Sequence, residues 1–184
     1  MIMEKVARTR GLGLALAALV VWIGVNPANA APRAKLAILP FEINDTSGEV
    51  GPASRHAEML SGLTQYSGER IQASGLYNIV ESGAVAKAVA EVNSGTHLRA
   101  CNGCELDIAR KAGADQVMIG WVWKVSTLIG TLHIEIKDVA SGRTTYSKVF
   151  DFRGDNSNAW ERATAYMVES IRKARDGGKA PDAG

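Results

Sequence analysis

Hydrophobic runs in the first half of the chain predict two short strands, at 35–41 and at 77–80. The run 35–41 (KLAILPF) is almost wholly apolar after Lys35, which is typical of a strand covered on both faces. The stretch 42–51 is rich in Asn, Asp, Ser and Gly, so we expect it to be a loop. A second short strand is predicted at 77–80.

Four segments show apolar residues at the three- and four-residue spacing of a helix that buries one face. They are 54–74, 82–92, 104–112 and a last segment that begins near Ser157. The inward stripe of the third segment is predicted to be Cys104, Ile108 and Ala112. The buried positions of the last segment are predicted to be Trp160, Ala163, Met167 and Ile171.

Three β-strands are predicted between the third and fourth helices. In 114–126 every second residue is apolar: Val117, Ile119, Trp121, Trp123 and Val125. The other face carries Lys124, so we expect a half-buried strand with Trp121 and Trp123 in the core beneath a helix. Strands at 131–137 and 143–152 follow, joined by a turn at Ser141-Gly142. The order βαβα-α-βββ-α predicts an α/β fold, with a mixed sheet of about five strands and helices packed on it.

The first thirty residues have the three parts of a secretory signal peptide. Lys5, Arg8 and Arg10 precede the uncharged run 11–25, and Ala28-Asn29-Ala30 offers small residues for cleavage after Ala30. A membrane anchor is the alternative, but a spanning helix needs about 20 apolar residues and this run is shorter. We therefore expect a periplasmic protein whose mature chain has no membrane span. Its organisation would be a single domain at 31–174 and a flexible tail at 175–184.

Cleavage changes the charge balance. The full chain has 21 basic and 19 acidic residues, and residues 1–30 hold three of the bases and one of the acids, so 18 of each remain. A mature chain without net charge has no general attraction to nucleic acid or to an anionic membrane. The composition, 46% hydrophobic and 22% charged, is that of a globular protein.

Cys101 and Cys104 are the only cysteines, and their C-x-x-C spacing leaves three interpretations open. In an oxidising compartment we expect a disulfide, which the turn residues Asn102-Gly103 permit and which fixes the start of the following helix. A redox-active dithiol is the second interpretation, because a helix N-terminus lowers the pKa of a thiol, but the strand and proline that accompany C-x-x-C in thioredoxin-like enzymes are missing. The third is a metal site with four donors, His97, Cys101, Cys104 and Asp107.

The mature chain contains no other motif that points to catalysis. It has neither the G-x-S-x-G of a hydrolase nor a phosphate-binding glycine loop, and His56 and His133 are expected on the surface. No cofactor is expected. The candidate binding residues are Trp121, Trp123 and Lys124, since two tryptophans on one strand face can line an aromatic pocket.

Several segments resemble known families. LAILPF (36–41), LYNIV (76–80) and AGADQVMIGWV (112–122) resemble the amino-terminal domain of TolB and the periplasmic domain of CsgG. That resemblance implies an α/β module that docks to partners in the cell envelope and is not an enzyme. A small family of secreted bacterial proteins of unknown function is similar in CNGCELDIARKAGAD (101–115), GWVWKVSTLIG (120–130), Arg153-Gly154 and Trp160-Glu161-Arg162. Thr127 and the segment 155–158 depart from that family's pattern.

The second resemblance implies that members of the family accompany periplasmic quinoprotein alcohol dehydrogenases. Together with the export signal, the resemblances predict a non-enzymatic accessory or binding module whose partner is another periplasmic or envelope protein. A thiol-disulfide protein that uses Cys101 and Cys104 is one alternative, and a metal-handling protein is the other.

Overall fold

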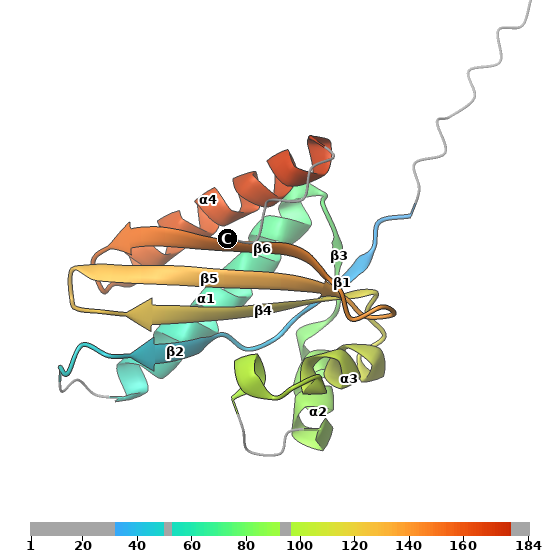
Figure 1. The fold of residues 1–184 in the computed structure, drawn as a ribbon, viewed down its shortest axis with the longest axis horizontal. Coiled ribbons are helices and arrows are strands. Elements are labelled where there is room, and N and C mark those ends of the chain that lie inside the picture. Colours follow the sequence, from blue (N-terminus) through green and yellow to red (C-terminus); the bar gives the residue numbers. More distant parts are fainter. Residues whose placement is uncertain (1–31, 50–52, 93–96, 178–184) are drawn as a thin grey trace, which may run out of the picture. The chain divides into compact units, whose positions relative to one another are not determined.

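The computed structural model describes residues 32–49, 53–92 and 97–177, and the predicted signal peptide with its cleavage site lies outside them. The described residues form the predicted α/β fold, with a mixed sheet and helices packed on it (Figure 1). The strands are β1 (Lys35–Ile38), β2 (Glu42–Asp45), β3 (Asn78–Ile79), β4 (Gln116–Lys124), β5 (Ile129–Asp138) and β6 (Thr144–Arg153). The helices are α1 (Ala53–Ser74), α2 (Ser82–Val92), α3 (Cys104–Lys111) and α4 (Ser157–Asp176), with a 3₁₀ turn η1 (Leu98–Ala100) before α3.

β4 is the central strand of the sheet. The strand order is β3-β1-β4-β5-β6, and β2 pairs with the second half of β4 beyond the end of β1. The pairs formed by β1 and β2 are parallel, whereas β4, β5 and β6 form two successive antiparallel pairs. The mixed sheet follows from the chain order, because helices connect the parallel strands and tight turns connect the antiparallel ones.

β2 corrects the expectation that 42–51 is a loop and makes the sheet six-stranded. Its four residues pair in parallel with Trp121–Lys124 of β4. Among the described strands β2 has β4 as its sole neighbour, so it is an edge strand, and only Ile43 packs against the core. A short polar edge strand has no hydrophobic alternation that separates it from a loop.

The hydrophobic core lies on both faces of the sheet. On one face α1 contacts β2 and β3 while α4 contacts β5 and β6, so this layer spans the width of the sheet. On the other face α2 and α3 pack over β1 and the first half of β4, where Val117 and Ile119 are buried. On this second face the 3₁₀ turn η1 contacts β4, and Glu105 of α3 reaches Lys137 at one end of β5, but α2 and α3 do not extend over Trp123 or over β6 (Figure 1).

Local signals set the ends of the long helices. Gly75, at a positive φ of 70°, ends α1 and donates its N–H to the carbonyl of Gln72 at 3.1 Å. The side chain of Asn156 caps α4 by accepting the N–H of Ala159 at 3.0 Å.

The predicted start of α4 and its buried residues are confirmed. These buried residues are Trp160, Ala163, Met167 and Ile171. The helix extends to Asp176, so Arg175 and Asp176 belong to the helix and not to the predicted tail.

Candidate functional site

An aromatic cluster lies on the sheet face that α2 and α3 leave uncovered. The rings of Trp121 on β4 and His133 on β5 are stacked, with centroids 4.8 Å apart and planes at 15°. The ring centroids of Trp123 and His133 are 6.2 Å apart. On the next strand, β6, Val149 pairs with His133. We define the open face as the surface formed by Trp121, Trp123, Val125, Ile129, His133 and Val149.

The open face exposes large apolar side chains. Trp123 is 42% exposed, Val149 is 50% exposed and Ile129 is 51% exposed. Thr131 and Asp151 lie on the same face among these apolar side chains, and covering the face would remove apolar surface from water. The arrangement is therefore suited to binding another molecule through apolar contact.

The expectation that both tryptophans lie in the core is wrong for Trp123. Residues of β4 alternate as predicted, but the side with full helical cover is the opposite one, which carries Met118, Val122 and Lys124. Trp121 is half buried at the margin of the core under α2 and α3. The alternation of apolar residues could not show which face of β4 the helices cover, because a central strand carries apolar residues on both sides.

His133 is a half-buried aromatic ring in the open face. Its Nε2 lies 2.8 Å from the Oγ1 of Thr131. Burial lowers the pKa of His133 below its usual value, and the negative charge of Asp151 offsets part of this effect. The lowered pKa favours the uncharged ring between the two tryptophans.

Acidification is expected to weaken the folded state through His133. Because the pKa of the folded protein lies below the ordinary value of about 6.5, the unfolded chain takes up the proton first. This contribution to stability is complete above the ordinary pKa and is lost as the pH falls through the folded pKa. Urea unfolding of His133→Gln should show a shallower fall in unfolding free energy than the wild type between roughly pH 7.5 and pH 5. Identical slopes for the two proteins would contradict this prediction.

A buried lysine lies at the end of β4, on the side of α1 and α4. Lys124 is only 5% exposed. Its Nζ lies 3.0 Å from Oε2 of Glu49, 3.3 Å from Oδ2 of Asp45 and 3.4 Å from Oδ2 of Asp155. The same Asp155 oxygen lies 3.2 Å from Nε2 of His56. We define the Lys124 cluster as Asp45, Glu49, His56, Lys124 and Asp155.

The charges of the Lys124 cluster support one another. Burial alone would favour the neutral amine of Lys124, but hydrogen bonds to Glu49 and Asp45 and the charge of Asp155 outweigh it and raise the pKa of Lys124. Burial likewise opposes the charge of Asp45, whose pKa is nevertheless lowered by hydrogen bonds from Ser47 and Lys124. Lys124 thus keeps its positive charge, which makes it poorly suited to act as a base. It joins the ends of β2, β4 and β6, and His56 links Asp155 to the start of α1.

Lys124, predicted from the alternation in the sequence to lie on the polar side of its strand, instead lies on the side that α1 and α4 cover. The surface position expected for His56 is also wrong, since its side chain is 14% exposed and its ring is stacked on Trp160 with centroids 6.4 Å apart. Asp45 and Asp155 were not recognised, because they are distant in sequence and no local spacing relates them. Their positions could have suggested the cluster, because Asp45 ends β2 and Asp155 closely follows β6. The carboxyl ends of neighbouring strands often lie together and form sites.

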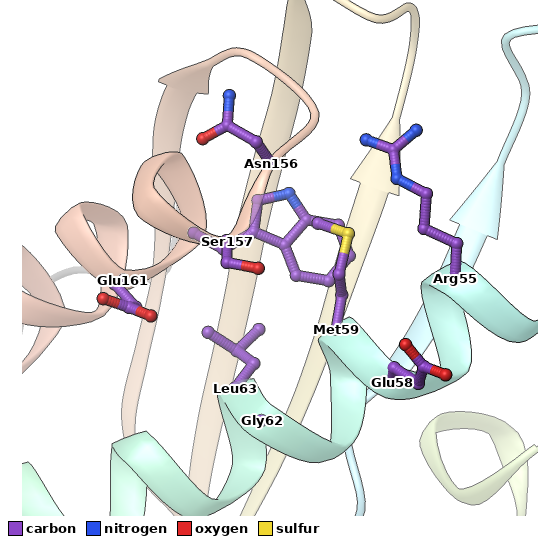
Figure 2. Close-up of a pocket in the computed structure, with 9 residues that line it drawn as sticks. Arg55, Glu58, Met59, Gly62, Leu63, Asn156, Ser157 and Glu161 are labelled. Carbon is purple, nitrogen blue, oxygen red and sulfur yellow. The ribbon is translucent and has the colours of Figure 1, made fainter.

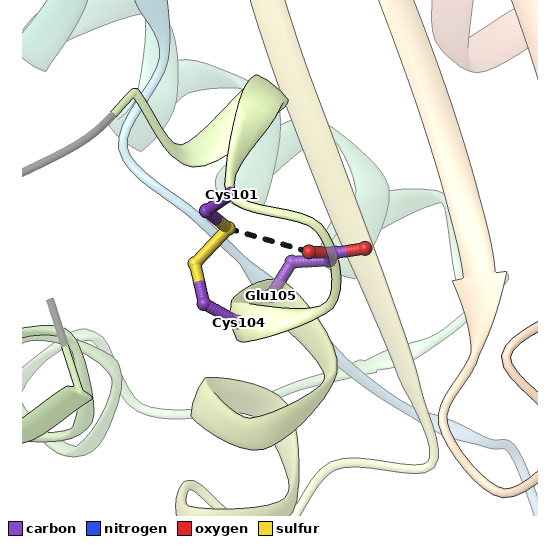
Figure 3. A group of neighbouring side chains, drawn as sticks. All are labelled: Cys101, Cys104 and Glu105. Atoms are coloured by element: carbon purple, nitrogen blue, oxygen red, sulfur yellow. Dashed lines mark hydrogen bonds between the residues drawn. A yellow bond between two sulfur atoms is a disulfide. The ribbon is translucent and has the colours of Figure 1, made fainter. Parts of the chain in front are cut away.

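A disulfide joins Cys101 and Cys104 at the start of α3, with the Cα atoms 5.5 Å apart (Figure 3). The buried carboxylate of Glu105 lies beside it, with Oε2 3.4 Å from the Sγ of Cys101. Oε2 also accepts the N–H of Gly103 at 3.0 Å, and Oε1 accepts from Nζ of Lys137 at 2.9 Å. Glu105 therefore ties the disulfide turn to β5.

Glu105 is a charged group despite its burial. Burial opposes the carboxylate, but hydrogen bonds from Lys137 and from backbone N–H groups outweigh it and lower the pKa of Glu105. Glu105 directly follows the C-x-x-C motif, but no spacing in the sequence relates it to Lys137 of β5.

The four residues considered as metal ligands are not brought together. Nδ1 of His97 lies 3.4 Å from Oε1 of Glu42, and Asp107 pairs with Arg110 at 2.5 Å. The two sulfur atoms are bonded to each other, and a disulfide lacks the thiolate charge with which cysteine binds a metal. Within the described ranges the donor group that includes both cysteines is completed by Glu105 instead of His97 and Asp107.

The disulfide is expected to resist reduction. The carboxylate of Glu105 disfavours the thiolate of Cys101, whereas catalytic cysteines lie in electropositive surroundings that favour it. We therefore expect a reduction potential below about −300 mV, and we expect Glu105→Gln to raise it. Alkylation of free thiols after equilibration in glutathione or dithiothreitol buffers measures both. A wild-type potential between about −270 and −120 mV would instead indicate a redox catalyst.

Two hollows flank α1. An apolar groove of about 1030 Å³ lies between α1 and α2, where the N–H of Phe41 is bound by Thr64 at 3.0 Å and the N–H of Ile79 by Gln72 at 2.8 Å. Because side chains of α1 already accept hydrogen bonds from these two N–H groups, neither group is free to pair with the backbone of an added strand. A smaller cavity of about 370 Å³ lies between α1 and α4 (Figure 2).

These features define a small α/β domain whose sheet is covered by helices on one face and is half open on the other. The chain belongs to the family DUF3280, described as "Protein of unknown function (DUF2380)", whose model matches residues 34–171. No curated protein matches the sequence. In the described part of the chain, none of the helices combines the length and the apolar character that crossing a membrane requires.

Similar solved structures come from several bacteria. Lipoprotein GNA1162 from Neisseria meningitidis is 13% identical, with a TM-score of 0.50 over 77% of this chain and 98% of that chain. The C-terminal domain of LpoB from Salmonella enterica is 15% identical, with a TM-score of 0.46 over 67% of this chain and 86% of that one. TolB from Acinetobacter baumannii is 17% identical, with a TM-score of 0.45 over 80% of this chain and 30% of that one. The likeness to GNA1162 is one of fold, and a shared fold does not carry function with it.

Proposed function

We propose that this protein is a non-enzymatic accessory module of the bacterial periplasm that binds another envelope protein through the open face. The observation that carries the proposal is the exposed apolar surface of Trp123, Ile129 and Val149 on an uncovered half of the sheet. Aromatic residues are enriched in the cores of protein interfaces, and tryptophan is prominent among the residues that dominate binding energy.

The rigidity of the open face also supports protein binding. β4 and β5 pair without interruption from Gln116↔Asp138 to Lys124↔Gly130, so Trp121, Trp123 and His133 are held by a continuous ladder. The Lys124 cluster fixes the far end of β4 from the opposite side. Side chains on a rigid frame lose less conformational freedom on association, which leaves more of the contact energy for affinity.

The compartment and the class of partner are proposed from the sequence. The signal-peptide pattern at 1–30 favours export, and the Cys101–Cys104 disulfide fits an oxidising compartment. The family resemblance makes a periplasmic quinoprotein dehydrogenase the first partner to test. Since the mature chain has no net charge, recognition would depend on shape and apolar contact more than on long-range attraction.

Photo-cross-linking in living cells of the native host tests this function. A photoreactive amino acid at position 123 should give one discrete adduct with an envelope protein, which mass spectrometry identifies. The matched control is position 166, because Tyr166 on α4 is 70% exposed but lies outside the open face. The absence of an adduct at position 123, or the same adduct at both positions, would overturn the proposal.

A further inference from the structure

β6 is the long free edge of the sheet. It is 10 residues long, it pairs with β5 on one side, and no described strand lies on its other side (Figure 1). The strands at the opposite edge are shorter, since β2 has 4 residues and β3 has 2. Near them, the N–H groups of Phe41 and Ile79 already donate to side chains of α1. Among the described strands, β6 therefore offers the longest edge to an added strand.

A hydrogen bond at the end of β6 shows which of its backbone groups point outwards. The N–H of Gly154 donates to the carbonyl of Leu128 at 3.1 Å, in line with the β5–β6 pair. In an antiparallel pair, every second residue points its backbone groups at the same neighbour. The even-numbered residues at the end of β6 therefore bond β5, and three residues direct their N–H and C=O groups away from the sheet: Ser147, Val149 and Asp151. No described residue bonds these outward groups.

β6 lacks the features that commonly keep an edge strand from pairing with another chain. It contains no proline, and its one irregularity lies near its start, opposite Ile136 and Lys137. Its single lysine, Lys148, donates from Nζ to Oγ of Ser170 on α4 at 3.0 Å, so its charge is held on the helical side of the sheet. Proline, bulges and free lysines are the usual protection of an edge strand. The part of β6 that follows the irregularity is therefore open to pairing.

The side chains along this edge define the chemistry of a strand that would fit it. Val149, Asp151 and Arg153 follow one another on the side of the sheet that carries the open face, and Val149 is part of that face. Neither Asp151 nor Arg153 forms an ion pair with any residue in the described ranges. Opposite charges and apolar side chains that lie directly across a strand pair stabilise it. A complementary strand thus carries an apolar, a basic and an acidic residue at every second position.

We propose that the envelope partner of the open face contributes an extended segment that pairs with β6 and adds a strand to the six-stranded sheet. The segment places its apolar residue beside Val149, its basic residue beside Asp151 and its acidic residue beside Arg153. In strand addition of this kind, backbone hydrogen bonds supply affinity and the alternate side chains supply specificity. The inference rests on the proposed function, because the added strand extends the open face across Val149 to the same partner.

Amide hydrogen exchange, followed residue by residue by nuclear magnetic resonance, tests the added strand. The complex is formed with the envelope protein that a photoreactive amino acid at position 123 captures and identifies. On binding, the amides of Val149 and Asp151 should exchange at least about tenfold more slowly, because pairing gives them acceptors that they lack in the free protein. The amides of Phe150 and Phe152 point to β5, so they should exchange slowly in both states.

A pair of variants at Ser147 tests the backbone contact separately. Ser147→Pro removes one outward N–H and leaves the bonds to β5 in place, since an edge strand tolerates proline where the N–H faces solvent. It should weaken partner binding about tenfold. Ser147→Ala keeps the N–H and should bind as the wild type does. Circular dichroism checks that both variants fold, and if Ser147→Pro does not, the exchange of Val149 and Asp151 decides.

The outcomes distinguish the added strand from the function on which it rests. If position 123 captures the partner but the amides of Val149 and Asp151 exchange as fast in the complex as in the free protein, the added strand is wrong and docking through the open face stands. Equal affinities of folded Ser147→Pro and Ser147→Ala would also overturn the added strand. If position 123 captures no envelope protein, the proposed function and the added strand are both wrong.

Discussion

Replacing Lys124 with methionine is expected to lower the free energy of unfolding by about 3–5 kcal/mol. Methionine keeps much of the length of the side chain but removes the ammonium that faces Asp45, Glu49 and Asp155. Without the ammonium the three carboxylates repel one another and the buried Asp155 keeps only His56 and Arg55 as neighbours, so removing this one partner of a buried ionic cluster is costly. Urea unfolding at neutral pH measures the loss.

The acid response gives an additional check on the Lys124 cluster. The pKa of Asp45 is lowered in the folded protein, so its contribution to stability is present above the ordinary pKa and is lost as the pH falls through the folded pKa. The deficit of Lys124→Met should therefore shrink below about pH 4.

Lys111 provides the matched control for this substitution. It pairs with Glu91 at 3.1 Å, but both side chains are about half exposed. Lys111→Met should therefore cost no more than about 1 kcal/mol. Equal losses for the two lysine variants would show that the Lys124 cluster contributes no more than a surface ion pair.

Replacing Trp123 with glutamate is expected to abolish partner binding while the protein still folds, with a loss of stability limited to the contact with His133 and the hydrogen bond from Nε1 to Oγ1 of Thr46 at 2.9 Å. The side chain is already partly exposed, so a polar replacement needs no new burial. In a complex, however, the carboxylate would be desolvated against an apolar surface, and an unpaired buried charge is strongly unfavourable. Co-purification of the cross-linked partner and thermal unfolding together measure the two outcomes.

Tyr166→Glu is the control for a change of charge and volume at an exposed aromatic residue on the opposite layer. It should leave both partner binding and stability unchanged. Retained binding by Trp123→Glu, or loss of binding in both variants, would exclude the open face as the docking surface.

Much of the fold follows from periodicity. The four helices and the strands β4, β5 and β6 are long enough for their spacing to be recognised, and the buried residues of α4 lie where a single amphipathic stripe places them. β2 could not be found in this way, because its pairing with β4 depends on a neighbour distant in sequence and only Ile43 faces the core.

The site was less accessible to sequence reasoning because its properties depend on which layer covers which part of the sheet. Trp121 and Trp123 share one strand face, yet α2 and α3 end short of Trp123 and leave it exposed. Lys124 occupies a position that looks polar and solvated in the sequence, and carboxylates from three other segments make its burial possible. These facts arise from tertiary packing and have no local pattern.

Hydroxyl-radical footprinting of the complex with its partner tests the central claim most directly. The method compares the oxidation of exposed side chains in the free and bound protein, and Trp123 and Tyr166 are both accessible in the free protein. We expect oxidation of Trp123 and Val149 to fall sharply on binding while oxidation of Tyr166 stays unchanged. Unchanged oxidation of Trp123, with protection confined to α4 or to the groove between α1 and α2, would contradict docking through the open face.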